Sequence, residues 1–214
     1  MAMKFRSIAV EGPIGVGKTS FVELLVRKFD AHKVLEEIDN PFLNEFYDDK
    51  QGAAFQAQLF FLMSRFRQLQ DLNQRDLFHQ ITVCDYIFPK DKIFAYLNLD
   101  DSELLIYDKL YAMLEEQTPL PDMVIFLQAE TRTLVERIKI RNREYETSIS
   151  EAYVNEVNKA YNYFFFHYTQ TPLLVIDTTE IDFVHHEEHL DELIDQIEKM
   201  DRGVQYYRPL GVKL

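Results

Sequence analysis

The chain has 214 residues, of which 47% are hydrophobic, and this is enough apolar material for one α/β domain with a substantial core. Its formal net charge of -13 argues against a surface that binds a nucleic acid polymer, because such surfaces gather Lys and Arg against the phosphate backbone. The N-terminus carries no long apolar segment and the single cysteine, Cys84, cannot form an internal disulfide, so we expect a cytoplasmic protein without membrane attachment.

Short apolar runs alternate with longer helical patterns along the chain, which is typical of a parallel sheet covered by helices on both faces. The expected strands are residues 7–10, 33–36, 81–85, 123–127 and 173–176. The expected helices are residues 18–29, 54–72, 90–97, 102–116, 131–141, 151–167 and 187–200. We therefore expect a three-layer α/β/α fold with a five-stranded parallel sheet. A single domain would cover residues 1–200, and residues 201–214, which lack periodicity, would form a tail or contact a partner chain.

The clearest motif follows the first expected strand. Residues 12–19 read G-P-I-G-V-G-K-T and match the phosphate-binding loop G-x-x-x-x-G-K-[ST] completely. Between a strand and a helix, such a loop directs backbone N–H groups at phosphate oxygens. We expect Lys18 to neutralise the transferred phosphoryl group and Thr19 to ligate Mg²⁺. The residues expected to bind ATP are Gly12, Pro13, Ile14, Gly15, Val16, Gly17, Lys18, Thr19 and Ser20.

The loop alone does not separate kinases from GTPases, but the rest of the sequence does. A GTPase normally carries N-K-x-D to bind guanine. The Asn158-Lys159 pair is followed by Ala160 and Tyr161, and it lies inside a helical pattern. A P-loop kinase of a small molecule is the interpretation that remains.

Two carboxylates end the second and third expected strands, at the sheet edge where ligands bind in open α/β folds. Glu36 lies near the phosphate loop and could accept the proton of an acceptor hydroxyl, although a solvated carboxylate at a strand end explains it about equally well. Asp85 could hold Mg²⁺ or its water shell. Glu36 is therefore a candidate for the acceptor side of the site, and Asp85 is a candidate for its metal ion.

Polar residues also border the expected core of two helices. Gln58 and Arg65 lie one heptad apart beside the apolar stripe of residues 54–72. The sequence R-I-K-I-R-N-R places Arg137, Arg141 and Arg143 at the end of another helix, where they could form a cationic lid over phosphates or simply interact with the helix C-terminus.

Taken together, these stretches resemble the deoxyribonucleoside kinases, especially the bacterial deoxyguanosine and deoxyadenosine kinase branch. The resemblance covers about residues 5 to 200. It is carried by V-E-G-P-I-G-V-G-K-T, L-E-E-I-D-N-P-F-L-N-E-F-Y, F-Q-A-Q-L-F-F-L-M-S-R-F-R-Q, C-D-Y-I-F-P-K-D-K-I-F-A and R-I-K-I-R-N-R-E-Y-E. It implies transfer of the ATP γ-phosphate, with Mg²⁺, to the 5′-hydroxyl of a deoxynucleoside, with a purine as the favoured base. It also implies a homodimer, formed through helices such as residues 54–72 and 102–116.

The resemblance assigns roles to individual positions. The implied catalytic residues are Glu36 as base, Lys18, Arg141, Arg143 and Asp85, and the implied metal ligands are Thr19 and Asp85. The implied substrate contacts are Glu36, Tyr47 and Glu146 at the sugar, Gln58, Arg65 and Asp91 around the base, and Phe94 stacked on it. The Arg–Asp pair disfavours thymidine as the preferred substrate.

One departure from the family pattern is informative. Where many members carry Glu-Arg after the third strand, this chain has Asp85-Tyr86, so one phosphate-facing arginine is missing and its work would fall to Lys18 and the lid. The rival interpretations are a thymidylate-type nucleoside monophosphate kinase, which needs more cations for its acceptor, and a catalytically silent homologue that only binds nucleotide.

Overall fold

The computed structural model describes residues 4–36, 39–48, 50–75, 80–142 and 149–209. Its strands are β1 (Ser7–Glu11), β2 (His32–Val34), β3 (Thr82–Cys84), β4 (Met123–Gln128), β5 (Leu173–Asp177) and β6 (Val204–Tyr207). Its helices are α1 (Lys18–Phe29), α2 (Leu43–Tyr47), α3 (Ala53–Arg75), α4 (Lys90–Asn98), α5 (Asp101–Glu115), α6 (Thr131–Arg141), α7 (Glu151–Phe166) and α8 (Glu187–Lys199).

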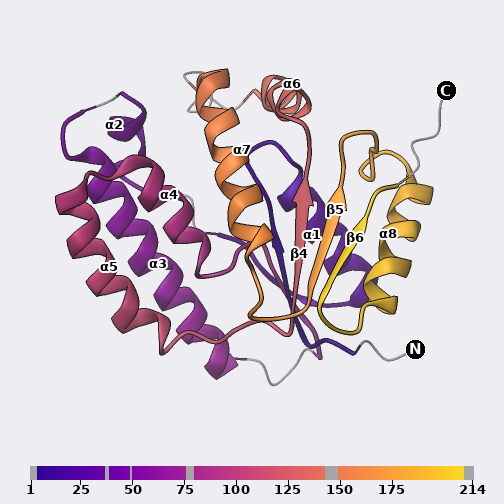
Figure 1. Ribbon diagram of the computed structural model, residues 1–214. Helices are drawn as coiled ribbons and strands as arrows, with labels where there is room; N and C mark the ends of the chain where they lie inside the picture. The colour runs from indigo at the N-terminus through magenta and orange to yellow at the C-terminus, as the bar shows by residue number, and fades with distance from the viewer. Residues whose placement is uncertain (1–3, 37–38, 49, 76–79, 143–148, 210–214) are drawn as a thin grey trace.

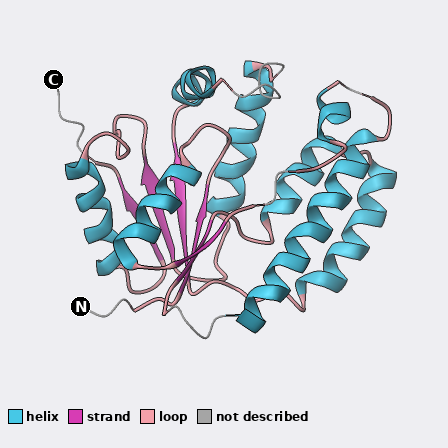
Figure 2. Cartoon of the chain, turned by 180° about the vertical axis from the view of Figure 1, so that it is seen from behind, coloured by secondary structure: helices cyan, strands magenta, loops and turns pink. Residues whose placement is uncertain are grey.

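The strands form one six-stranded sheet in the order β2-β3-β1-β4-β5-β6, and every pairing is parallel. Helices cover both faces, so the three-layer α/β/α prediction is confirmed (Figure 1). Figure 2 shows α1 in front of the sheet, α8 next to the edge that β6 forms, and α3 and α5 on the opposite side, toward the edge that β2 forms.

Successive side chains of β1 point to opposite faces of the sheet and so pack in different hydrophobic clusters, as the two-residue repeat of a strand requires. Ile8 and Val10 of β1 pack in the cluster that includes α1 and α8. Ala9 between them packs in the cluster that includes Tyr161 and Phe165 of α7. Strands buried on both faces read as continuous apolar runs, which is why the central strands were visible in the sequence.

The sheet has six strands where the sequence predicted five, and this correction lies within residues 201–214. There β6 pairs with β5, with Leu173 opposite Val204 and Ile176 opposite Tyr207. An edge strand half-exposed to solvent has no need of an apolar run: Tyr206 is 67% exposed. The short helix α2 was also missed, because its five residues include no buried side chain and so carry no periodic signal.

The order of the strands in the sheet determines where a ligand can bind. The chain leaves β1 through α1 toward β2 on one side, whereas β4 and β5 lie on the other side of β1. Ligands of open α/β sheets bind outside the carboxyl ends of strands at such a reversal. The loop after β1, residues 12–17, begins at this reversal. Among the described residues, no helix combines the length and apolar character that crossing a membrane requires.

Candidate active site

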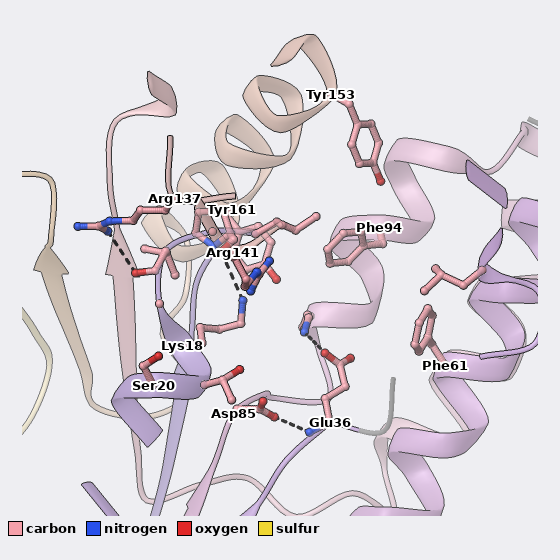
Figure 3. A pocket seen from close by; sticks show the side chains of 18 of the residues that line it. Lys18, Ser20, Glu36, Phe61, Asp85, Phe94, Arg137, Arg141, Tyr153 and Tyr161 are labelled. Atoms are coloured by element: carbon pink, nitrogen blue, oxygen red, sulfur yellow. Dashed lines mark hydrogen bonds and ion pairs between the residues drawn. The ribbon is translucent and has the colours of Figure 1, made fainter. Parts of the chain in front are cut away.

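A cavity of about 690 Å³ opens at the carboxyl end of β1. Figure 3 shows Lys18 and Ser20 of the phosphate loop on one side of it, and Phe61 of α3 and Phe94 of α4 on the other. Glu36 and Asp85 lie between these two walls. One cavity therefore joins the loop expected to hold the donor to the helices expected to hold the acceptor.

The phosphate loop takes its shape from glycines at crowded positions. Gly15 has a φ of +86°, and a Cβ there would lie 2.7 Å from the carbonyl oxygen of Leu134 in α6. At Gly12 a Cβ would collide with the carbonyl oxygen of Leu127 at the end of β4. Only glycine allows the loop to pack this closely against β4 and α6, and this packing fixes the start of α1.

Lys18 is the first residue of α1, and its ammonium folds back onto the loop. Its Nζ donates to the carbonyl oxygen of Gly12 at 2.5 Å and lies 3.4 Å from that of Pro13. Burial and the charge of Lys90 lower the pKa of Lys18 to about 8. An anion such as a triphosphate would stabilise the charged form of Lys18 and raise this pKa again.

Glu36 lies two residues beyond β2, and both of its carboxylate oxygens carry ion pairs. Oε1 accepts from the guanidinium of Arg65, at 2.8 Å from Nε, and Oε2 accepts from Nζ of Lys90 at 2.6 Å. Burial alone would raise the pKa of Glu36, but Arg65 and Lys90 outweigh it and hold the pKa well below the usual range. The side chain is therefore a fixed, fully ionised carboxylate facing the cavity.

Asp85 follows β3 directly and lies beside Glu36. Its Oδ1 accepts from the backbone N–H of Glu36 at 2.6 Å, which ties the ends of β2 and β3 together. Burial raises the pKa of Asp85, although Lys90 acts in the opposite direction. Thr19 and Asp85, the two predicted metal ligands, both line the cavity. Oxygen donors of this kind suit Mg²⁺, which binds few protein carboxylates and completes its shell with phosphates and water.

The predicted base-binding residues form one connected network on α3 and α4. Arg65 donates to both Glu36 and Asp91, and Gln58 donates to the side chain of Asp91 and, at 3.0 Å, to its carbonyl oxygen. The hydroxyl of Tyr107 in α5 donates to Oδ1 of Asp91 at 2.8 Å. Asp91 is fully buried, while Gln58 and Arg65 line the cavity, so the carboxylate orients these two side chains from behind.

The remaining predicted substrate residues are placed as follows. Tyr47 lines the cavity from α2, and Phe94 lines it from α4 with its ring edge-on to Tyr161, 6.0 Å between centroids. Arg141 lines the cavity from the exposed end of α6. Arg143 and Glu146 lie outside the described residues. The assigned roles of all five stay predictions.

Arg137 lines the cavity, and it is also bonded to backbone carbonyl oxygens around the phosphate loop. Its guanidinium donates to the carbonyl oxygen of Val16 at 3.3 Å, to that of Thr178 at 2.7 Å and to that of Ile181 at 3.1 Å. These bonds brace the phosphate loop against the segment after β5. The lid role that the sequence suggested for Arg137 stays a prediction.

Several residues of the site were not singled out in the sequence. Lys90 begins α4 and binds Glu36, although a lysine at the start of a helix carries no sequence signal of burial. Glu11 ends β1 and is fully buried, accepting from the backbone N–H of Gly12 at 3.1 Å and of Ile87 at 2.9 Å. Burial and the charge of Glu11 raise the pKa of the Tyr161 hydroxyl. A charge ending an otherwise apolar strand beside the loop was the one available signal for Glu11.

The comparisons with known proteins agree with this geometry. A sequence model of a family described as "Deoxynucleoside kinase" matches residues 8–201. The chain is 37% identical over 156 residues to a deoxyguanosine kinase of Bacillus subtilis strain 168, covering 72% of this chain and 75% of that protein. It is 36% identical over 163 residues to a deoxyadenosine kinase of Dictyostelium discoideum, covering 73% of this chain and 65% of that protein.

Solved structures show the same fold and a nucleotide-binding site. A deoxyadenosine kinase from M. mycoides with the products dCMP and a flexible dCDP bound superposes with a TM-score of 0.78 at 26% identity. The match covers 90% of this chain and 99% of that one. The same enzyme with dATP bound gives a TM-score of 0.76 at 25% identity, covering 89% of this chain and 97% of that one.

Proposed function

The chain belongs to the deoxynucleoside kinase family, and we propose that it transfers the γ-phosphate of ATP to the 5′-hydroxyl of a purine deoxynucleoside, giving the 5′-monophosphate in nucleotide salvage. The observation that carries this proposal is the shared cavity, in which Lys18 of the phosphate loop and Glu36 of the acceptor side face one space. Family membership also removes the thymidylate-type kinase as the leading rival.

The proposed step is a direct transfer. The 5′-oxygen attacks the γ-phosphorus, the bond to the β-phosphate oxygen breaks, and ADP leaves with that bond's electrons. The hydroxyl proton passes to Glu36. Because Arg65 and Lys90 make this carboxylate a weak base, it takes the proton only as the new bond forms and the hydroxyl becomes acidic. Positioning and charge stabilisation then supply most of the acceleration.

We propose that Thr19 and Asp85 hold Mg²⁺ with ATP. The hydroxyl of Thr19 would be a direct ligand, and Asp85 would bind the ion or its water through the oxygen that does not accept from Glu36. When bound, the ion neutralises charge on the phosphate oxygens. Lys18 and the arginines at the end of α6, Arg141 and Arg143, would stabilise the transferred group.

The acceptor end suits a base rich in hydrogen-bonding groups. Gln58 and Arg65 line the cavity and are held by hydrogen bonds to Asp91, and Phe94 offers a flat apolar face. The relatives named for deoxyguanosine and deoxyadenosine favour a purine. Tyr47, with Glu146, would hold the sugar 3′-hydroxyl.

The test of the function is turnover of deoxyadenosine, deoxyguanosine, deoxycytidine and thymidine with Mg²⁺ and ATP, in wild type and in Glu36→Gln. We expect turnover of the purines, and a kcat for Glu36→Gln lower by about 10²-fold or more with nucleoside binding retained. Glu45→Gln, which alters an exposed carboxylate paired with Lys50 at 3.0 Å, is the matched control. Near-normal turnover by Glu36→Gln would refute the base, and reaction with thymidine alone would refute the assignment of Arg65 and Asp91.

We further propose that the protein is a homodimer formed through α3 and α5. These helices lie side by side at the end of the molecule away from β6 (Figure 1). They expose large apolar side chains: Met63, Leu105, Ile106, Leu110 and Met113. Light scattering would show twice the chain mass, and Leu105→Glu would halve it; a monomeric wild type would refute the interface. We place the reaction in the cytoplasm, in keeping with the free thiol of Cys84.

A further inference from the structure

Lys90 occupies an unusual position for a lysine. It is the first residue of α4, and its side chain is 5% exposed. A helix N-terminus disfavours a positive charge, and burial of an ammonium is costly without compensation. The helix therefore gains nothing from this cation, and a different contribution must explain why the fold accommodates it.

Ion pairing with Glu36 offsets part of that cost but uses only part of the ammonium. Among the described residues, Oε2 of Glu36, at 2.6 Å, is the one hydrogen-bond acceptor of Lys90. An ammonium has three N–H donors, so two remain for a ligand in the cavity that Lys90 lines. Glu36 and Glu11 also hold the pKa of Lys90 above its ordinary value despite burial, so the group is charged at neutral pH.

The other cations around the cavity are engaged differently. Arg65 is committed to Glu36 and Asp91, and Arg137 to backbone carbonyl oxygens. Lys18 lies on the carbonyl oxygens of the phosphate loop, where the proposed function places the donor phosphates. Arg65 and Lys90 both contact the proton acceptor Glu36, but Arg65 is also bonded to Asp91, whereas Lys90 keeps N–H donors that no described residue accepts, beside the place where the attacking oxygen would lie.

We propose, as an extension of the proposed function, that Lys90 is a catalytic residue that binds an oxygen of the phosphoryl group as this group passes from ATP to the 5′-hydroxyl. Its bond to Glu36 keeps the ammonium beside the attacking oxygen before transfer. As the 5′-oxygen–phosphorus bond forms, the hydroxyl proton moves to Glu36, whose carboxylate loses its charge. The ammonium then has a stronger partner in the new phosphate dianion than in the neutral acid.

This assignment revises the interpretation of Asp85-Tyr86. The ring of Tyr86 is buried in the core between α3 and α5, and its hydroxyl donates to Gln68 at 2.7 Å, so it faces away from the cavity. The work of the missing arginine was expected to fall to Lys18 and the lid. Lys90, four residues after Tyr86, instead supplies a cation from the same connection between β3 and α4.

The test compares Lys90→Met and Lys90→Arg with Lys92→Met. Lys92 lies in the same first turn of α4, but its ammonium sits over the ring of Tyr111, 4.2 Å from the centroid, so its loss removes the same charge away from the cavity. Calorimetry would measure binding of deoxyadenosine and deoxyguanosine and of their 5′-monophosphates. Steady-state kinetics would give kcat for each variant.

We expect Lys90→Met to lower kcat by about 10²- to 10³-fold, the usual cost of one preorganised charge donor. It should weaken monophosphate binding at least about tenfold and nucleoside binding less than about threefold, and Lys90→Arg should recover part of the monophosphate affinity. Lys92→Met should match wild type. A lysine that only holds Glu36 in place would not separate the two ligands.

Equal weakening of nucleoside and monophosphate, or a kcat for Lys90→Met within about threefold of wild type, would overturn the proposal. If Lys90→Met fails to fold, Lys90→Gln serves for the same comparison. A wild-type protein that phosphorylates no deoxynucleoside would refute the proposed function, whereas the binding comparison would still decide the role of Lys90.

Discussion

Replacing Tyr107 by Phe removes a single oxygen from the network behind the base-binding residues. The Tyr107 hydroxyl is fully buried and donates to Asp91 at 2.8 Å, while Gln58 and Arg65 supply the other bonds to that carboxylate. A hydrogen bond to a charged group contributes about 1.5–3 kcal/mol. In a chain of this size, about 2 kcal/mol lowers the midpoint of thermal unfolding by roughly 4–8 °C.

The replacement of Tyr107 by Phe should affect binding of the deoxynucleoside more than the rate of phosphoryl transfer. With one bond lost, Asp91 orients Gln58 and Arg65 less firmly, and we expect the KM for the deoxynucleoside to rise about three- to tenfold, with kcat within about twofold of wild type. Tyr111→Phe is the matched control. Tyr111 is equally buried one turn along α5, but its hydroxyl donates to Glu115 at 2.9 Å and not to the network.

Calorimetric unfolding and steady-state kinetics on both variants would check the prediction. Tyr111→Phe should cost at most about 1.5 kcal/mol and leave the KM unchanged. A rise in KM of the same size in both variants would show that general loosening of α5 is responsible. An unchanged KM in Tyr107→Phe would refute the idea that Asp91 acts on the base pocket through its neighbours.

Two further predictions concern the phosphate loop. Gly15→Ala should weaken ATP binding by more than about tenfold, because its Cβ would lie 2.7 Å from the carbonyl oxygen of Leu134. The control Gly52→Ala, at a similar φ of +75° but in open space, should cost only about 1 kcal/mol of stability. Equal ATP affinities of the two variants in a fluorescence titration would contradict this prediction. Because the pKa of Lys18 is lowered to about 8, this lysine is mostly neutral at pH 8.5, and bound phosphates favour its charged form. ATP binding at that pH should therefore take up about 0.7 of a proton, measured by calorimetry in buffers of different ionisation enthalpy, and Lys18→Met should lose this uptake.

The buried strands and helices could be predicted from the sequence, whereas an exposed edge strand and a short exposed helix could not. The apolar runs of β1 and β4 and the helix from Lys18 to Phe29 follow from periodicity, because their packing depends on sequence-local patterns. The strand β6 pairs through its backbone at an exposed edge, and α2 buries no side chain. Neither element needs an apolar sequence pattern to form, so the sequence did not reveal them.

The site divides in a similar way. Glu36, Gln58 and Arg65 were identifiable because a strand end and a heptad spacing predicted where they would lie. Lys90 and Tyr107 act through contacts that join separate helices, and no local pattern distinguishes a buried lysine or tyrosine from an ordinary one. Burial of a charge is a property of the folded chain, so these roles required the structure.

The connection between β3 and α4 is tied down along its whole length. Asp85 bonds to the backbone of Glu36, the backbone N–H of Ile87 bonds to Glu11, and Lys90 bonds to the carboxylate of Glu36. Homologous proteins diverge most readily by gaining or losing residues in surface connections. A residue inserted here would break at least one of these ties and carry Asp85 or Lys90 away from the cavity. Among relatives that keep this chemistry, the connection should therefore vary in residue type but not in length.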